Sequence, residues 1–261
     1  MGTVELLART LVGVEPEVLS RLARVAVERS AAKRDALFRA GEMPEALWLI
    51  QRGLVKLVRH TPRGPAICAL LGASESIGHL SIISGRPNAM DAIAASDRVV
   101  ALAFDRSELL EAMATSRRLE SALARSADRE MMALLEKIDV LSAGAVEARL
   151  ATLLLKLNQR FGDEFADGTS EIPIPLSRRE LAELVSTSCE TVVRVFCRWE
   201  REGLVATSRH GFILHEVEAL SAIAGTSSQP PPESGLRRTA LEERRAADSA
   251  RGAGPATALR R

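Results

Sequence analysis

Residues 186–204 read STSCETVVRVFCRWEREGL, a segment in which a carboxylate and a guanidinium lie four residues apart. Ser188 is a suitable N-cap, so the pattern predicts a helix that begins at about Cys189. On such a helix Glu190 and Arg194 share one face. A carboxylate can accept a hydrogen bond from cytosine N4, and a guanidinium can donate to guanine O6 and N7 or to phosphate. The alternative is a surface ion pair within the protein, worth about 0.3–0.5 kcal/mol.

The direction of this pair follows from the rotation of about 100° per residue along a helix. One arc of the helix is apolar, and we expect it to pack in a core: Val192, Val195, Phe196 and Trp199. A separate arc turned away from that core carries Cys189, Glu190, Val193, Arg194 and Cys197. The Glu-Arg pair is therefore predicted to face outward, with the carboxylate in the first turn, where recognition helices meet base edges.

A preceding helix is predicted because Ser177 and Glu180 have the spacing of a capping box, which starts a helix near Arg178. Two helices joined by about three residues form a helix-turn-helix, whose second helix can enter a major groove. Further along, two short strands flank a Ser-Arg-His-Gly turn, which predicts a β-hairpin wing. Between Leu176 and His215 the six Arg barely outnumber the five Glu, so we expect modest DNA affinity with a shallow salt dependence.

Residues 36–104 read as short strands separated by Gly and Pro turns, which is typical of a sandwich or a small β-roll. Residues 15–30 before them read as a helix. After Phe104 the apolar period becomes helical, and Asp105 can cap the first of the helices that follow.

A longer helix is predicted over residues 116–141. It carries apolar residues at alternating spacings of three and four: Ala124, Ala127, Met131, Leu134, Ile138 and Leu141. This heptad seam favours packing against a second copy of the chain in a dimer. The alternative is that the stripe packs on the β-domain.

Composition narrows the class of protein. The chain has 261 residues and a formal net charge of +1, which argues against broad nonspecific affinity for nucleic acid. It shows no signal peptide and no membrane span, so we expect a cytoplasmic protein without a membrane partner. The three cysteines are scattered and are expected to be reduced, free thiols. Residues 225–261 are rich in Pro, Gly, Ser, Ala and Arg and are expected to form a disordered tail.

The segments LSRRELAELVSTSCETVVRVFCRWEREGLV and LFRAGEMPEALWLIQRGLVKLV make the chain resemble the Crp/Fnr superfamily over about residues 16–222. The resemblance implies an α+β fold: an N-terminal double-stranded β-helix like the cyclic-nucleotide-binding β-roll, a long dimerisation helix and a C-terminal winged helix-turn-helix. The expected divisions are residues 1–115, 116–141, 142–224 and the tail. It further implies a homodimeric transcription regulator that binds a palindromic operator, controlled by an unidentified small-molecule effector, with RNA polymerase as a partner if it is an activator.

Residues of the family's DNA-binding surface carry over by position. Glu190 and Arg194 match the base-reading Glu and Arg, and Cys189 stands where the cyclic-AMP receptor has a further base-reading Arg. We therefore expect a different operator at that position. Contacts to the DNA backbone are expected from Arg178, Ser188, Thr191 and Arg209.

The corresponding effector pocket departs from the family pattern. It would include Gly78, His79, Arg86, Asn88 and Ala89. Family members that bind cyclic AMP have a Glu where His79 stands and Arg-Ser or Arg-Thr where Asn88 and Ala89 stand. Without these anchors, cyclic AMP is not expected to bind in the usual mode, because a phosphate oxyanion needs charge-assisted donors.

Several alternatives remain open from the sequence. His79 could bind haem, which would make the protein a haem-responsive regulator, but this alternative is not favoured. Cys68 could be a redox thiol, which would make it a redox-responsive regulator. A β-roll ligand-binding protein without a DNA role is a further alternative. An enzyme is not predicted: no nucleophile motif or phosphate loop is present, and the four histidines are isolated, so no catalytic residue or metal site is assigned.

Overall fold

The computed structural model describes residues 2–62 and 64–225. Residues 226–261, where a disordered tail is expected, lie outside this part of the chain. The chain divides into two compact units. Of the described residues, those up to Ser142 and residues 179–188 form the first unit, and residues 143–178 and 189–225 form the second. None of the described helices is both long enough and apolar enough to cross a membrane.

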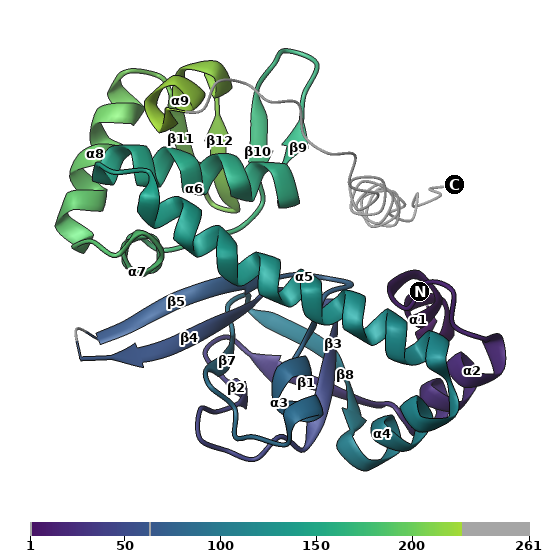
Figure 1. Cartoon of the computed structure of the whole chain (residues 1–261). Helices are drawn as coiled ribbons and strands as arrows, with labels where there is room; N and C mark the ends of the chain where they lie inside the picture. The colour runs from purple at the N-terminus through teal and green to yellow at the C-terminus, as the bar shows by residue number, and fades with distance from the viewer. Residues whose placement is uncertain (1, 63, 226–261) are drawn as a thin grey trace, which may run out of the picture. The chain divides into compact units, whose positions relative to one another are not determined.

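The strands of the first unit form two four-stranded antiparallel sheets, with the orders β1-β8-β3-β6 and β2-β7-β4-β5 (Figure 1). The bounds are β1 Val27–Ala32, β2 Ala36–Phe38, β3 Ala46–Arg52, β4 Val55–Thr61, β5 Gly64–Leu71, β6 Ser76–Ile77, β7 Asp91–Ala94 and β8 Arg98–Asp105. This arrangement confirms the predicted β-roll. The helix expected over residues 15–30 ends earlier, at Val25, because the chain from Val27 pairs with β8.

Alternation along β3 shows how the first sheet is covered on both faces. Ile50 belongs to the core between the sheets, to which β4, β5, β6, β7 and β8 also contribute. Leu47 and Leu49 belong to a second core on the other face, made with the helices. Because successive side chains of a strand point to opposite faces, one strand serves both cores.

The helices of the first unit are α1 Thr3–Thr10, α2 Pro16–Val25, α3 His79–Ser84, α4 Arg106–Thr115, α5 Arg117–Ser142 and α7 Arg178–Val185, of which Arg178 itself belongs to the second unit. Asp105 caps α4 as predicted: its Oδ1 accepts from the amide of Ser107 at 2.8 Å and of Glu108 at 3.3 Å. The helix expected over 116–141 is α5.

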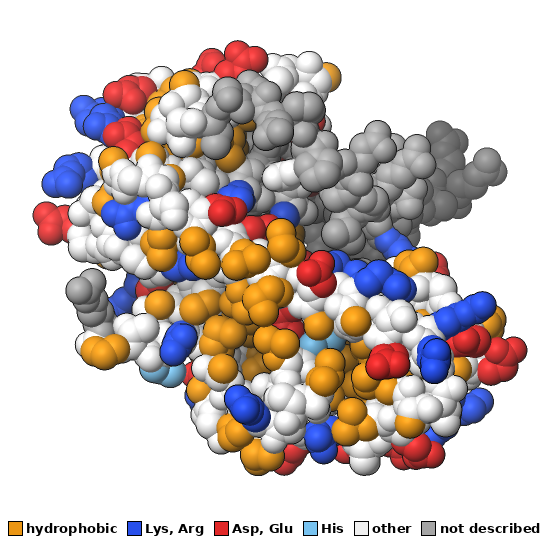
Figure 2. Space-filling model, viewed as in Figure 1, with side chains coloured by type: hydrophobic (Ala, Val, Ile, Leu, Met, Phe, Trp, Pro, Cys, Tyr) orange, Lys and Arg blue, Asp and Glu red, His pale blue; other side chains and the backbone are white. Residues whose placement is uncertain are grey.

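α5 has two distinct faces. The buried face carries Leu119, Ala122, Leu123, Ser126, Glu130, Ala133 and Val140. The exposed face carries an apolar strip of Met131, Met132, Leu135, Ile138 and Leu141. Figure 2 shows hydrophobic side chains gathered along this part of α5. Leu134 of the predicted seam instead packs partly on the roll core, and Leu135 lies outward.

The second unit contains α6 Val146–Phe161, β9 Asp163–Glu164, β10 Ser170–Ile172, α8 Cys189–Arg201, β11 Val205–Ser208, β12 Gly211–Leu214 and α9 Val217–Ala224. Its sheet has the order β11-β12-β10-β9, and β11 and β12 form the predicted hairpin wing. Gly211 allows β12 to lie against β10, because a Cβ at this position would be 1.9 Å from the Ile172 carbonyl oxygen.

Candidate nucleic-acid interface

An aromatic cluster anchors α8 within the second unit. The ring of Phe196 lies 5.7 Å from that of Trp199 and 5.6 Å from that of Phe212 on the wing strand β12. All three side chains are almost fully buried, together with Val192 and Val195. Aromatic pairs at such distances add about 0.5–1.5 kcal/mol beyond the burial of their area. The arc of α8 that was predicted to be apolar is therefore the arc that packs.

The carboxylate of Glu147, in the first turn of α6, also contacts α8. Trp199 Nε1 donates a hydrogen bond to Glu147 Oε1 at 3.0 Å, and Arg198 forms an ion pair with the same oxygen. Because the indole N–H would otherwise be buried without an acceptor, this contact fixes the rotation of α8 as well as stabilising it. Sequence reasoning did not identify Glu147, which lies more than forty residues before α8.

The opposite arc of α8 is free of the core. Between Cys189 and Cys197 its exposed residues are Cys189, Glu190, Val193, Arg194 and Cys197, and we call this set the reading face. Among the described residues, neither Glu190 nor Arg194 forms a salt bridge, so the alternative of a surface ion pair finds no support. Val193 is 42% exposed and was not named among the base-reading residues, although its place in the outward arc was evident; an exposed apolar group there can contact a thymine methyl.

The residues expected to contact the DNA backbone differ in their surroundings. Ser188 precedes α8 and is exposed, whereas Thr191 is half-buried. Arg209 is exposed in the turn between β11 and β12. These positions are compatible with phosphate contacts, and their roles stay predictions.

Arg178 is already engaged within the second unit. Its guanidinium carbon lies 3.9 Å from the centre of the Phe196 ring. Its Nη2 donates to Thr207 Oγ1 at 2.6 Å and lies 3.3 Å from Glu200 Oε1. Burial lowers the pKa of Arg178, and the neighbouring Glu200, Cys197 and Cys189 act in the opposite direction. The side chain thus joins α8 to the wing strand β11, which favours a positioning role over a free phosphate contact.

A buried carboxylate occupies the expected effector region of the first unit. Glu130 of α5 accepts from the backbone amides of Gly78 and His79 at 3.4 and 3.3 Å. The His79 ring Nδ1 lies 2.9 Å from Glu130 Oε2, and its Nε2 lies 3.2 Å from Ser76 Oγ. His79 is 1% exposed and Glu130 7%. His79 is therefore a hydrogen-bonded core residue within the part of the chain described.

The other expected pocket residues have different environments. Asn88 is buried, and its backbone exchanges hydrogen bonds with Gly41 and Glu42 at 2.8 and 2.9 Å. Arg86 and Ala89 are exposed. Glu130 was missed because it lies on the helix read as a dimer seam. The signal was a single charged residue on an inner face that otherwise carries apolar residues and Ser126.

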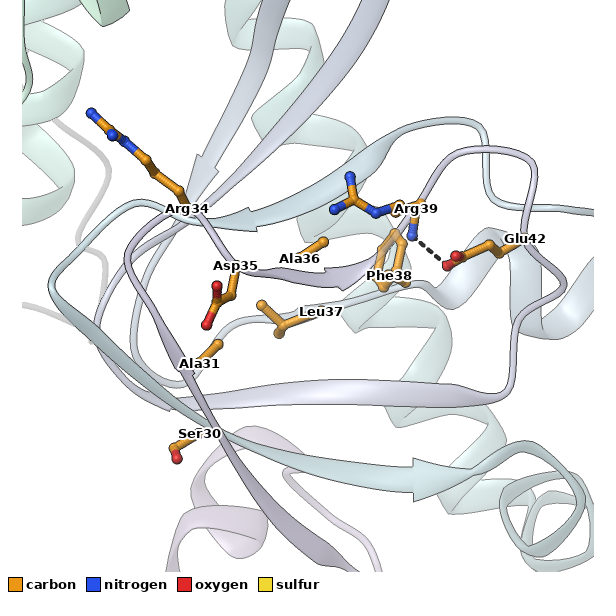
Figure 3. A pocket seen from close by; sticks show the side chains of 9 residues that line it. All are labelled: Ser30, Ala31, Arg34, Asp35, Ala36, Leu37, Phe38, Arg39 and Glu42. Carbon is orange, nitrogen blue, oxygen red and sulfur yellow. Dashed lines mark hydrogen bonds between the residues drawn. The ribbon is translucent and has the colours of Figure 1, made fainter.

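A surface hollow of about 570 Å³ lies elsewhere on the roll (Figure 3). It is lined by Ser30, Ala31, Arg34, Asp35, Ala36, Leu37, Phe38, Arg39 and Glu42, and by none of the expected effector residues. Its acids are already bonded: Asp35 accepts from the Ala32 amide at 3.0 Å, and Glu42 accepts from the Arg39 amide at 2.7 Å. Arg34 points away from the other lining side chains (Figure 3).

The described residues contain no group of three or more His, Cys, Asp and Glu side chains that could hold a metal ion. Cys68 is half-buried in the first unit, and Cys189 and Cys197 are exposed in the second.

Comparison with known proteins agrees with this geometry. Residues 28–116 match the cyclic nucleotide-binding domain family, and residues 148–223 match the Crp-like helix-turn-helix domain family. The CRP-like cAMP-activated global transcriptional regulator of Mycobacterium tuberculosis is 28% identical over 220 residues, covering 83% of this chain and 97% of the relative. The cyclic AMP receptor protein of Thermus thermophilus is 28% identical over 214 residues, covering 81% and 94%.

Solved structures show the same fold. FixK2 from Bradyrhizobium japonicum matches with a TM-score of 0.66 at 21% identity, covering 79% of this chain and all of that one. A CRP-family regulator from Thermus thermophilus matches with a TM-score of 0.63 at 22% identity, covering 77% and 98%. The chain belongs to the Crp/Fnr superfamily and is a DNA-binding transcription regulator.

We predict that Glu130→Ala lowers the free energy of unfolding of the first unit by about 2–4 kcal/mol, because buried amides and an imidazole lose their acceptor. Urea unfolding followed by fluorescence measures this in a Trp199→Phe background, where Trp48 alone reports on the first unit. Asp128→Ala, an exposed acid of the same helix, is the control and should change stability by less than about 0.5 kcal/mol. Equal losses in both variants would contradict the role given to Glu130.

Proposed function

We propose that the protein is a homodimer that binds a roughly palindromic operator in the cytoplasm, with α8 as its recognition helix. The observation that carries the proposal is the reading face, which presents an acid, a base, a small apolar residue and two thiols while the other face of α8 is held in the core. Glu190 would accept from cytosine, and Arg194 would donate to guanine. RNA polymerase is a further partner if the protein is an activator.

The apolar strip on α5 supports the dimer. Exposed apolar residues at spacings of three and four are unusual on a lone helix, and a second copy of α5 would cover them. A twofold dimer presents two identical recognition helices, which is why we expect a palindromic site.

One relative is named as activated by cyclic AMP and another as a cyclic AMP receptor, but the residues of this chain argue against that ligand in the usual mode. Asn88 and Ala89 offer no cation to a phosphate, and the amides of Gly78 and His79 already bind the Glu130 carboxylate. The protein thus supplies its own anion in this region, and we propose that the effector is a different small molecule.

Two alternatives keep less support. A haem-responsive regulator would use His79, yet that ring is enclosed and bonded on both nitrogens. A ligand-binding protein without a DNA role gives no function to Glu190 and Arg194, which are exposed and form no salt bridge with the described residues.

Selection from a randomised DNA duplex library by the full-length, reduced protein tests the proposal, and we expect a palindromic sequence to be enriched. Arg194→Ala should then lose its preference for that sequence over a scrambled duplex by roughly 10–100-fold, because each bidentate base contact discriminates by about 1–3 kcal/mol. Fluorescence anisotropy at fixed salt measures both affinities.

Arg209→Ala serves as the matched control, since it should weaken binding to both duplexes alike. Arg178→Ala should also weaken both, and in addition lower the melting temperature, because Phe196 loses the stacked guanidinium. Loss of sequence preference in Arg209→Ala equal to that in Arg194→Ala would overturn the assignment of roles.

The α5 strip can be tested by Ile138→Glu, which places a carboxylate at a 58% exposed apolar position. We expect a shift from dimer to monomer at micromolar concentration by analytical ultracentrifugation, with an unchanged circular dichroism spectrum. Met43→Glu makes the same change at a 60% exposed apolar position outside α5 and should remain dimeric. A dimeric Ile138→Glu variant, or a monomeric wild type, would contradict the seam.

Isothermal titration calorimetry tests the effector region. Cyclic AMP up to about 1 mM should give no saturable heat, and 5′-AMP should behave alike as the control. Saturable binding of cyclic AMP with a micromolar Kd would overturn the view that the Glu130 carboxylate and the missing arginine exclude it.

A further inference from the structure

Two of the three cysteines lie on the reading face of α8. Cys189 is the first residue of the helix, and Cys197 follows two turns later on the same side. Both are exposed, in contrast to Cys68, which is half-buried with its Sγ 3.7 Å from the Ala66 carbonyl oxygen. The accessible thiols of the described residues are thus concentrated on the surface proposed to meet DNA.

The two thiols cannot form a disulfide with each other inside one intact helix. Eight residues at 1.5 Å rise separate their Cα atoms by about 12 Å, whereas a disulfide requires less than about 7 Å. Each thiol is therefore open to a partner from solution.

Arg178 provides a cation near both thiols. Its own pKa responds to Cys197 and to Cys189, so the guanidinium lies within electrostatic range of each. Arg194 stands between them on the reading face. The nucleophile in exchange with disulfides is the thiolate, and both thiols are exposed to solvent.

We propose that Cys189 and Cys197 are modification sites for low-molecular-weight disulfides, and that their modification releases the protein from DNA. The inference rests on the proposed function of α8. A cysteine thiolate attacks one sulfur of the disulfide, the S–S bond breaks, and a mixed disulfide forms on the protein. The second sulfur leaves as a thiolate and takes up the proton that the cysteine lost. A free thiol reverses the exchange.

The consequence follows from size and charge. A glutathionyl group places a tripeptide with carboxylates beside Glu190 and Arg194, where base edges would have to approach within hydrogen-bond distance. It also adds negative charge to a surface that is proposed to meet phosphates. The segment between Leu176 and His215 has only six Arg against five Glu, so little net positive charge offsets this addition.

The test uses the full-length protein and the duplex that it selects when reduced. After treatment with glutathione disulfide, intact-mass and peptide-mass spectrometry should place adducts on Cys189 and Cys197, and anisotropy should show at least about tenfold weaker binding, restored by dithiothreitol. The Cys189→Ser/Cys197→Ser double variant should show the same affinity before and after treatment, whatever its starting affinity. Cys68→Ser, the matched control, should respond as the wild type does.

Three results would overturn the inference alone: no adduct on either cysteine, adducts with unchanged affinity, or sensitivity that disappears with Cys68→Ser. A reduced protein that selects no DNA sequence would overturn the proposed function, and the switch with it. Adduct formation is measured without DNA, so the two failures are distinguishable.

Discussion

The contact of Phe196 with Trp199 and Phe212 is the constraint on which the DNA-binding surface depends. A helix of thirteen residues can present many faces, and the aromatic cluster leaves only one of them free. Glu147 holds the indole N–H, and Arg178 covers the Phe196 ring from the side of the wing. Few side chains of α8 could contact bases, because one arc of the helix is buried in the core. The packing of the core therefore decides which side chains of α8 are exposed.

The first unit uses a buried ionic group in a comparable way. The Glu130 carboxylate accepts from the backbone amides of Gly78 and His79 and also contacts the His79 ring. These contacts offset the cost of burying a carboxylate in a core. The amides of Gly78 and His79 are therefore already bonded within the chain.

Much of the fold could be predicted because its signals are local. The two arcs of α8, the Asp105 cap and the hairpin wing follow from spacing within a few residues. The failures were of another kind. Residues 27–30 read as part of a helix but belong to strand β1, because β8, about seventy residues later in the chain, pairs with them. The contacts of Glu147, Glu130 and Arg178 likewise join residues that are distant in sequence. No periodicity reports such pairs, although a lone charge on an apolar helix face marks where to look.

The two faces of α5 have a consequence for how this helix can move. Rotation by one residue, about 100°, would take the Glu130 carboxylate out of reach of the α3 amides and expose a different outer stripe. Intermediate angles would leave the carboxylate buried and unbonded, which is the costliest arrangement. Any turn of α5 would therefore have to break both amide contacts. A ligand in the roll would favour such a turn only by binding the turned helix more tightly than the observed one.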